Sequence, residues 1–186
     1  MGSYLNPGNF SFRGSLRSKI YIDKSGLISK TNETICTEQK YICVSRPRKF
    51  GKSMAANMLT AYYSKGCDSR ELFSPYKISE SDSFEKHLNK YNVIHINMVE
   101  YLTEAKSIEN LIKYIEDDII GEITDSMPEL VMPRRISLTK VLTSAFNQFK
   151  IPFIFIIDEW DCIFRKSSIR SEEYTAYLDF LRTLLK

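Results

Sequence analysis

Residues 45–53 read Ser45-Arg46-Pro47-Arg48-Lys49-Phe50-Gly51-Lys52-Ser53, and this loop stands between an apolar run and an amphipathic segment. The run before it, residues 41–44 (YICV), predicts a buried strand that extends to Ser45. The segment after it predicts a helix from about residue 52 to about residue 65, where Gly66 provides a stop signal. A strand, a tight turn containing Gly-Lys-Ser and then a helix form the arrangement that binds nucleotide phosphates.

Each residue type in the loop has a chemical reason to be there. Gly51 allows the backbone to approach a phosphate, and the amides at the helix N-terminus offer donors and the positive end of a dipole. Lys52 would place a compact charge on the β and γ phosphates, and the Ser53 hydroxyl could ligate Mg²⁺. We therefore expect ATP to be bound by Arg46, Pro47, Arg48, Lys49, Phe50, Gly51, Lys52, Ser53 and Met54.

A second stretch, residues 151–159, supplies the carboxylates that a phosphate site needs. Residues 151–157 are apolar at almost every position, as expected for a central strand of a parallel sheet that is covered on both faces. Asp158 at its end would hold the same Mg²⁺ as Ser53, directly or through water. Glu159 would orient and deprotonate an attacking water, a role that hydrolases require and kinases do not. Lys52 and Glu159 are thus the expected catalytic residues.

Simpler interpretations exist for the same residues. Lys52 and Ser53 could begin an ordinary exposed helix, and residues 158–161 could be an acidic loop after a strand. Arg46, Arg48 and Lys49 could screen phosphate charge or be solvated surface cations. Upstream, Tyr21, Asp23 and Lys24 could contact an adenine, although a role in pinning the N-terminal segment onto the domain is the stronger expectation.

Length and composition indicate one soluble domain. The chain has 186 residues, of which 43% are hydrophobic, and a net charge of +3, which is too small to indicate nucleic-acid binding by itself. No stretch approaches the roughly 18 apolar residues of a membrane span, and the N-terminus lacks a signal-peptide core. The four cysteines form no CxxC pair, which favours structural thiols over a zinc site and a reducing, cytoplasmic location.

The remaining periodicity predicts alternating strands and helices. A strand is expected at residues 93–97, and helices are expected at 25–32, 84–88, 107–125, 138–149 and 171–186. This alternation is typical of an α/β layered fold with a mostly parallel sheet flanked by helices. Residues 1–35 are expected to form an irregular arm, which extends to about residue 17, and a short helix, and residues 36–186 are expected to form the P-loop NTPase core.

Four ordered blocks resemble one family. Residues 5–9 (LNPGN), 20–28 (IYIDKSGLI), 45–53 and 156–161 (IIDEWD) look like the predicted AAA-ATPase-like family of bacterial proteins, in which an arginine replaces the first glycine of the phosphate loop. The resemblance implies a P-loop NTPase fold with Walker A and Walker B motifs, Mg²⁺-dependent ATP hydrolysis, and often a PD-(D/E)XK nuclease-like domain further along. Nucleic acid would be a partner of that domain.

The resemblance also implies a later strand between the phosphate-loop strand and the acidic strand, and the sequence ends at Lys186 without it. We therefore expect an incomplete, N-terminal portion of the AAA-like domain. Three arrangements are open: a longer protein supplies the strand, the two motif strands pair directly, or another chain completes the sheet, as in a homo-oligomer. An unpaired edge favours association.

The sequence is compatible with three functions. The leading one is an Mg²⁺-dependent ATPase. The alternative is a nucleotide-binding switch or interaction module with little turnover, because neither a γ-phosphate sensor nor an arginine finger can be assigned from the sequence. A small-molecule kinase is a third reading, which the adjacent Asp158 and Glu159 disfavour.

Overall fold

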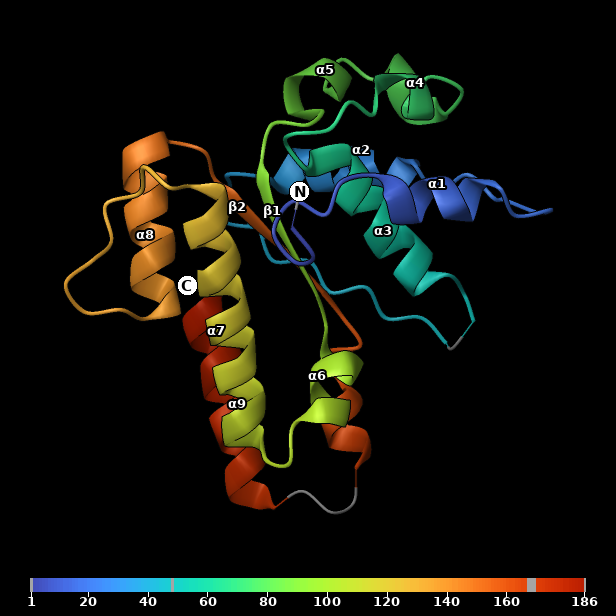
Figure 1. The fold of residues 1–186 in the computed structure, drawn as a ribbon. Coiled ribbons are helices and arrows are strands. Elements are labelled where there is room, and N and C mark those ends of the chain that lie inside the picture. Colours follow the sequence, from blue (N-terminus) through green and yellow to red (C-terminus); the bar gives the residue numbers. More distant parts are fainter. Residues whose placement is uncertain (1, 48, 167–169, 186) are drawn as a thin grey trace.

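The computed structural model describes residues 2–47, 49–166 and 170–185, and it shows a small parallel sheet between two groups of helices (Figure 1). In chain order the elements are α1 (Phe10–Leu16), α2 (Gly26–Thr34), α3 (Lys52–Tyr63), α4 (Arg70–Phe73), η1 (Lys77–Glu80), α5 (Phe84–His87), β1 (Asn92–Asn97), α6 (Met98–Glu104), α7 (Ile108–Ser126), α8 (Leu138–Phe149), β2 (Phe153–Asp158), η2 (Cys162–Arg165) and α9 (Ser171–Leu184). The chain is therefore an α/β protein, as the alternating pattern predicted.

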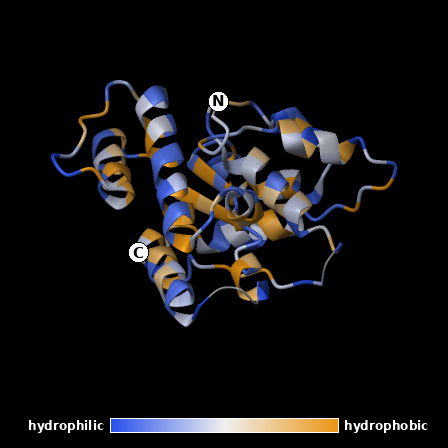
Figure 2. Cartoon of the chain, turned by 60° about the horizontal axis from the view of Figure 1, so that its bottom comes forward, coloured by the Kyte–Doolittle hydropathy of each residue, from blue (hydrophilic) through white to orange (hydrophobic). Residues whose placement is uncertain are grey.

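The sheet consists of β1 and β2, which run parallel with Asn92 opposite Phe153 and Asn97 opposite Asp158. Parallel pairing brings the carboxyl ends of the two strands together, so Asp158 lies beside Asn97 at one end of the sheet. The strands form the hydrophobic centre in Figure 2. On its other edge β1 is bridged by the N-terminal segment, since the His95 amide donates to the Tyr4 carbonyl at 2.9 Å.

Alternate strand residues face two separate cores, as the period of two in a strand requires. Ile94 and Ile96 of β1 are fully buried in a core with α6, α7, α8 and α9. Val93 of β1 and Ile156 of β2 face the opposite core, with α1, α2, α3 and α5. The apolar run of residues 151–157 therefore does form a strand with packing on both faces, but the expectation of a central strand is wrong: within the described residues β2 pairs with β1 alone, and only Ile156 of this strand is buried.

Residues 1–17 were expected to be irregular, and this expectation is wrong for α1. The helix forms because Phe12 is fully buried and stacks on Phe73, with ring centroids 5.2 Å apart. A single buried aromatic anchor thus outweighs a local sequence that is rich in Gly, Ser and Asn. The predicted helices at 25–32, 84–88, 107–125, 138–149 and 171–186 are confirmed within a few residues by α2, α5, α7, α8 and α9.

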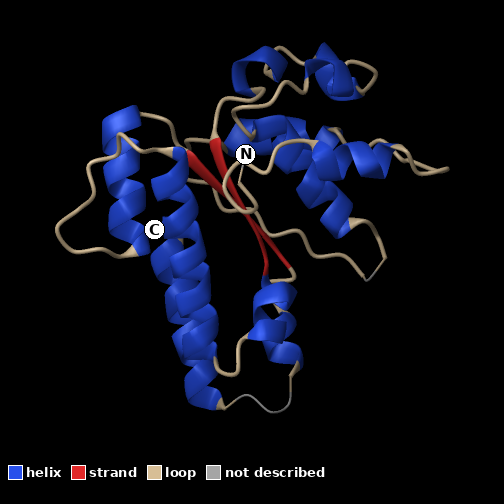
Figure 3. Cartoon of the chain, in the orientation of Figure 1, coloured by secondary structure: helices blue, strands red, loops and turns tan. Residues whose placement is uncertain are grey.

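The strand predicted at residues 41–45 is also wrong. This segment is extended loop in the structure (Figure 3), and Tyr41, Ile42 and Val44 are 57%, 46% and 44% exposed. The physical reason is the absence of a partner. Within the described part of the chain β2 pairs with β1 alone, so no strand edge satisfies the backbone groups of residues 41–45. The two motif segments therefore do not pair directly here.

No helix within the described ranges combines the length and the apolar character needed to cross a membrane.

Candidate nucleotide-binding site

The loop that precedes α3 turns sharply into the helix. Gly51 has φ +75°, and Lys49 also has a left-handed backbone with φ +67°. Glycine adopts this conformation without the Cβ strain of other residues, and a Cβ at Gly51 would lie only 2.5 Å from the Lys24 Nζ. The first helical bond follows at once, with the Ala55 amide donating to the Gly51 carbonyl at 3.0 Å. The free amides of the first turn of α3 therefore start directly after the glycine.

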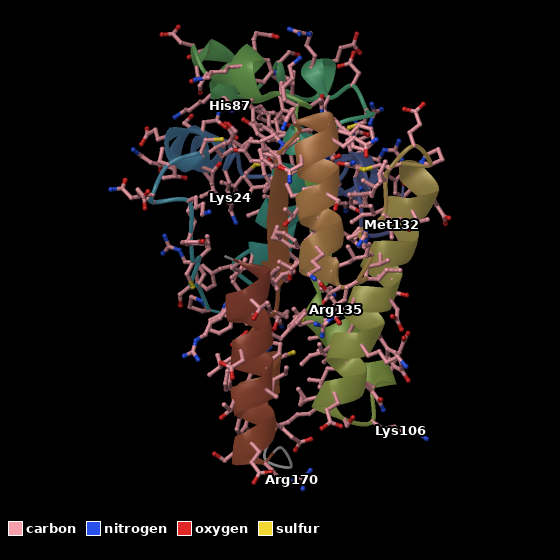
Figure 4. All side chains as sticks on the ribbon, turned by 90° about the vertical axis from the view of Figure 1, so that its left-hand side faces the viewer. Lys24, His87, Lys106, Met132, Arg135 and Arg170 are labelled. Atoms are coloured by element: carbon pink, nitrogen blue, oxygen red, sulfur yellow. The ribbon has the colours of Figure 1, made fainter. Side chains whose placement is uncertain are left out.

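Two lysines bind carbonyls of this loop. The Lys52 Nζ donates to the Arg46 carbonyl at 2.8 Å, and the Lys24 Nζ donates to the Phe50 carbonyl at 2.7 Å. Both ammonium groups thus lie at the loop. Lys24 comes from the segment before α2, on the side of the molecule that carries α2 and α3 in Figure 4. The lysines hold the loop from both ends and place positive charge next to its backbone.

Tyr21 and Asp23 contact neighbouring parts of the domain, as expected for residues that pin the N-terminal segment onto it. The Asp23 Oδ1 accepts from the Ser25 amide at 2.7 Å, and its Oδ2 accepts from the Lys77 amide at 3.3 Å. The Tyr21 ring packs against Phe12 and Tyr76, and burial raises the pKa of Tyr21 to about 12. Within this block it is Lys24 that reaches the loop.

The acidic residues follow β2 at the same end of the sheet. Asp158 is the last residue of the strand, and Glu159 turns the chain with φ +52°, a left-handed conformation that is uncommon outside glycine. The Asp158 Oδ1 accepts from the Glu159 amide at 2.9 Å. The turn is fixed further on by Tyr177 of α9, whose hydroxyl donates to the Trp160 carbonyl at 2.8 Å. The direction of Glu159 is thus set by the local backbone.

Glu159 forms an ion pair with Arg165, the last residue of η2. The Arg165 Nη2 contacts the Glu159 Oε2 and lies 3.6 Å from the Asp161 Oδ1. Hydrogen bonding to the Glu159 carboxylate raises the pKa of Arg165 above its usual range. Both side chains retain about a third of their exposure, so solvent can reach the pair.

A cavity of about 540 Å³ lies between the loop and this acidic turn. This volume falls within the roughly 300–1,000 Å³ of small-molecule sites. One wall is the loop and the start of α3, a second is α6, and a third is the segment from the acidic turn through η2. Its lining residues are Lys49, Gly51, Lys52, Ser53, Met54, Val99, Leu102, Thr103, Glu159, Cys162, Arg165 and Lys166.

Six of the residues expected from sequence therefore line one cavity: Lys49, Gly51, Lys52, Ser53, Met54 and Glu159. Arg46, Pro47, Phe50 and Asp158 are described but are not among its lining residues, and Arg48 lies outside the described residues. The Arg46 carbonyl accepts from Lys52, and Phe50 is 62% exposed.

The cavity also contains residues that sequence reasoning missed. Val99, Leu102 and Thr103 are there because α6 begins directly after β1, at the same end of the sheet as Asp158. Arg165 and Lys166 are there because η2 folds back after the acidic turn. The signal available in the sequence was a basic pair close behind the acidic motif. Burial raises the pKa of the neighbouring Cys162, so its thiol stays protonated near neutral pH.

Of the two residues expected to ligate Mg²⁺, Ser53 lines the cavity, whereas Asp158 is the last residue of β2 and is not among the lining residues. In nucleotide sites Mg²⁺ needs only one or two protein oxygens, because phosphates and water complete its shell. In the part of the chain that is described, no group of three or more His, Cys, Asp or Glu side chains could hold a metal ion without such help.

A Gly-Lys-Ser turn that opens a helix, with an acidic strand end across a cavity, resembles the arrangement of P-loop nucleotide sites, although the strand expected before the loop is not formed. The family comparison agrees with this resemblance. The model of the family described as predicted AAA-ATPase matches residues 12–186, and the chain belongs to that family. Searches of curated proteins and of solved structures found no match to the chain.

Proposed function

We propose that the cavity binds ATP with Mg²⁺ and that the chain hydrolyses it. The observation that carries the proposal is that one cavity contains Lys52 and Ser53, at the start of α3, together with Glu159 from the acidic strand end. These residues come from segments more than 100 positions apart in the sequence, and their convergence is what phosphoryl-transfer chemistry requires. Membership of the predicted AAA-ATPase family supports the same function.

In this proposal each side chain has one task. Lys52 exchanges its bond to the Arg46 carbonyl for the β and γ phosphates, and the free amides at the start of α3 bind phosphate oxygens. Ser53 and Asp158 would hold Mg²⁺, which supplies neutralisation of phosphate charge when bound. Glu159 orients the attacking water and accepts its proton.

A second function is favoured by a specific observation, the ion pair between Glu159 and Arg165. A carboxylate that is bound to a guanidinium is a weaker acceptor for a water proton. The chain would then bind nucleotide as a conformational switch, with little turnover. The two functions share the same binding site and differ only in the use of Glu159.

Steady-state release of phosphate from ATP, with and without Mg²⁺, distinguishes the two functions. For the hydrolase, Glu159→Gln should lower turnover by about 10²–10⁴-fold while nucleotide binding persists, because general-base catalysis contributes about that much. The matched control is Glu172→Gln, which changes an exposed carboxylate in the first turn of α9. Equal turnover in wild type and Glu159→Gln would contradict the role of Glu159. Tight binding without turnover in wild type would favour the switch.

The open edge of β2 supports a further part of the proposal, which concerns partners. In the described ranges, only β1 pairs with β2, and the extended residues 41–44 expose apolar side chains. We therefore propose that a strand from a second copy of the chain, or one associated with a nuclease-like domain of the kind that the family resemblance implies, pairs with this edge. Light scattering tests pairing between two copies of the chain. A molar mass equal to that of the monomer at all concentrations would rule out such pairing.

The state of the cysteines supports a proposal for where the protein is located. The four cysteines are free thiols, and Cys36 and Cys43 are exposed. Exposed free thiols persist in a reducing compartment, which supports placing the protein in the cytoplasm.

A further inference from the structure

Arg165 occupies a position that neither the loop motif nor the acidic motif accounts for. It lines the same cavity as Lys52 and Ser53, and its guanidinium pairs with Glu159, the residue expected to activate water. The neighbouring Lys166 is held by the Leu102 carbonyl at 3.4 Å. Arg165 therefore places a positive charge in the cavity, at the acidic turn.

The charge of the cavity favours a highly negative ligand. Its lining includes four basic side chains, Lys49, Lys52, Arg165 and Lys166, and one acidic side chain, Glu159. A triphosphate carries more negative charge than a diphosphate, and it extends further beyond the loop. The Arg165 pair is also easy to exchange, because it is partly exposed and such pairs are weak. A guanidinium binds phosphate oxygens in the same bidentate way as it binds a carboxylate.

We propose that Arg165 binds the terminal phosphate of a nucleoside triphosphate and, in doing so, releases Glu159 from their ion pair. The proposal rests on the nucleotide-binding function above and adds what the site recognises, namely the third phosphate. Without a triphosphate Arg165 pairs with Glu159, and with one Arg165 pairs with the terminal phosphate. Arg165 is thus a specificity-determining residue for triphosphate over diphosphate.

The test is calorimetric titration of the full chain with ADP and with a non-hydrolysable ATP analogue, both in Mg²⁺. Wild type should prefer the analogue. Arg165→Gln should reduce this preference about tenfold, because a hydrogen bond to a charged group is lost for one ligand only. Arg165→Lys should keep most of the preference. Arg182→Gln, which breaks an exposed ion pair with Asp179 on α9, is the matched control and should change nothing.

A double-mutant cycle measures the coupling energy between Arg165 and Glu159 in nucleotide binding, which a purely structural role of Arg165 would not produce. Glu159→Gln should tighten analogue binding, because Arg165 then breaks no ion pair with residue 159 when it binds the terminal phosphate. In the Arg165→Gln background the same change should tighten binding less, because only the repulsion between the Glu159 carboxylate and the phosphates is then removed. Equal weakening of both nucleotides by Arg165→Gln, or equal tightening by Glu159→Gln in both backgrounds, would overturn the inference alone. Absence of nucleotide binding by wild type would overturn the proposed function and the inference with it.

Discussion

Two apolar segments of this chain look alike in sequence and differ in structure. Phe153–Asp158 forms β2, with six residues in register with β1 and both faces covered. Residues 41–44, which lead into the phosphate loop, form no strand and expose their side chains. The difference teaches that an apolar run becomes a strand only where another strand edge accepts its backbone hydrogen bonds.

The phosphate loop is held differently at its two ends. A loop that follows a paired strand is held from both sides, whereas here α3 holds the end of the loop and, among the described residues, no strand holds its beginning. The bonds from Lys24 to the Phe50 carbonyl and from Lys52 to the Arg46 carbonyl take over part of that task. We therefore expect the sheet to determine stability and the two lysines to determine the shape of the loop.

The largest expected effect comes from comparing the same isoleucine-to-alanine substitution in the sheet and in residues 41–44. Ile94→Ala, at a fully buried position of β1, should lower the free energy of unfolding by about 2–5 kcal/mol. Ile42→Ala, at a position that is 46% exposed, should change it by less than about 0.5 kcal/mol. Urea denaturation followed by circular dichroism measures both. A loss above 2 kcal/mol for Ile42→Ala would mean that residues 41–44 are paired in solution.

The fold was predictable where local periodicity and burial agree. Ile108, Leu111, Ile115, Ile119 and Ile123 repeat on one face of α7, and all five are buried. The sequence of residues 41–45 satisfies the local rules for a strand. Among the described residues no neighbouring strand pairs with this segment, and the local sequence does not reveal that. α1 was missed for the opposite reason, since its stability comes from Phe12 packing on Phe73, a contact between distant residues.

A second, smaller effect concerns the lysine that stabilises the loop. Lys24→Met removes the donor to the Phe50 carbonyl and should weaken binding of the ATP analogue about three- to tenfold, because a charged hydrogen bond at an exposed site is worth about 1 kcal/mol. Fluorescence titration with a labelled analogue measures the dissociation constant. The melting temperature should change little.

Lys24→Arg should restore most of the affinity, and Lys30→Met, at an exposed lysine of α2, serves as the control. Unchanged affinity in Lys24→Met would show that the loop keeps its shape without this bond. The sheet would then support the loop more than Lys24 does.

The candidate site was predictable as far as the two motifs extend. Lys52, Ser53 and Glu159 were expected from sequence, and the fold brings them to one cavity. Arg165 was not expected, because its place depends on the turn at Glu159 and on η2, and neither leaves a periodic pattern. The wall from α6 was missed because it requires knowing that β1 and β2 are parallel neighbours.

The smallest effect is a pH dependence that belongs to the sheet. Burial lowers the pKa of His95 on β1, with Asp158 and Glu100 partly opposing, and its Nδ1 lies 3.0 Å from the Thr60 Oγ1. Between the lowered value and about 6.5 the unfolded chain binds more protons than the folded one, so stability should fall as the pH drops through this window.

Urea denaturation at about pH 7 and about pH 5.5 tests this dependence. His95→Gln should make the loss of stability smaller, and what remains includes His87, whose pKa is also lowered by burial. An identical loss in wild type and His95→Gln would show that His95 does not couple the sheet to pH.

The central claim is that the cavity beside Lys52 is a nucleotide site, and calorimetric titration of the chain with the non-hydrolysable ATP analogue and Mg²⁺ tests it most directly. Wild type should bind with a stoichiometry of about one per P-loop. Lys52→Ala should weaken binding by at least about tenfold, since a charge-assisted contact to phosphate is lost. Lys113→Ala, at an exposed lysine of α7, should bind like wild type. Binding that is equal in wild type and Lys52→Ala, or absent from wild type, would contradict the claim.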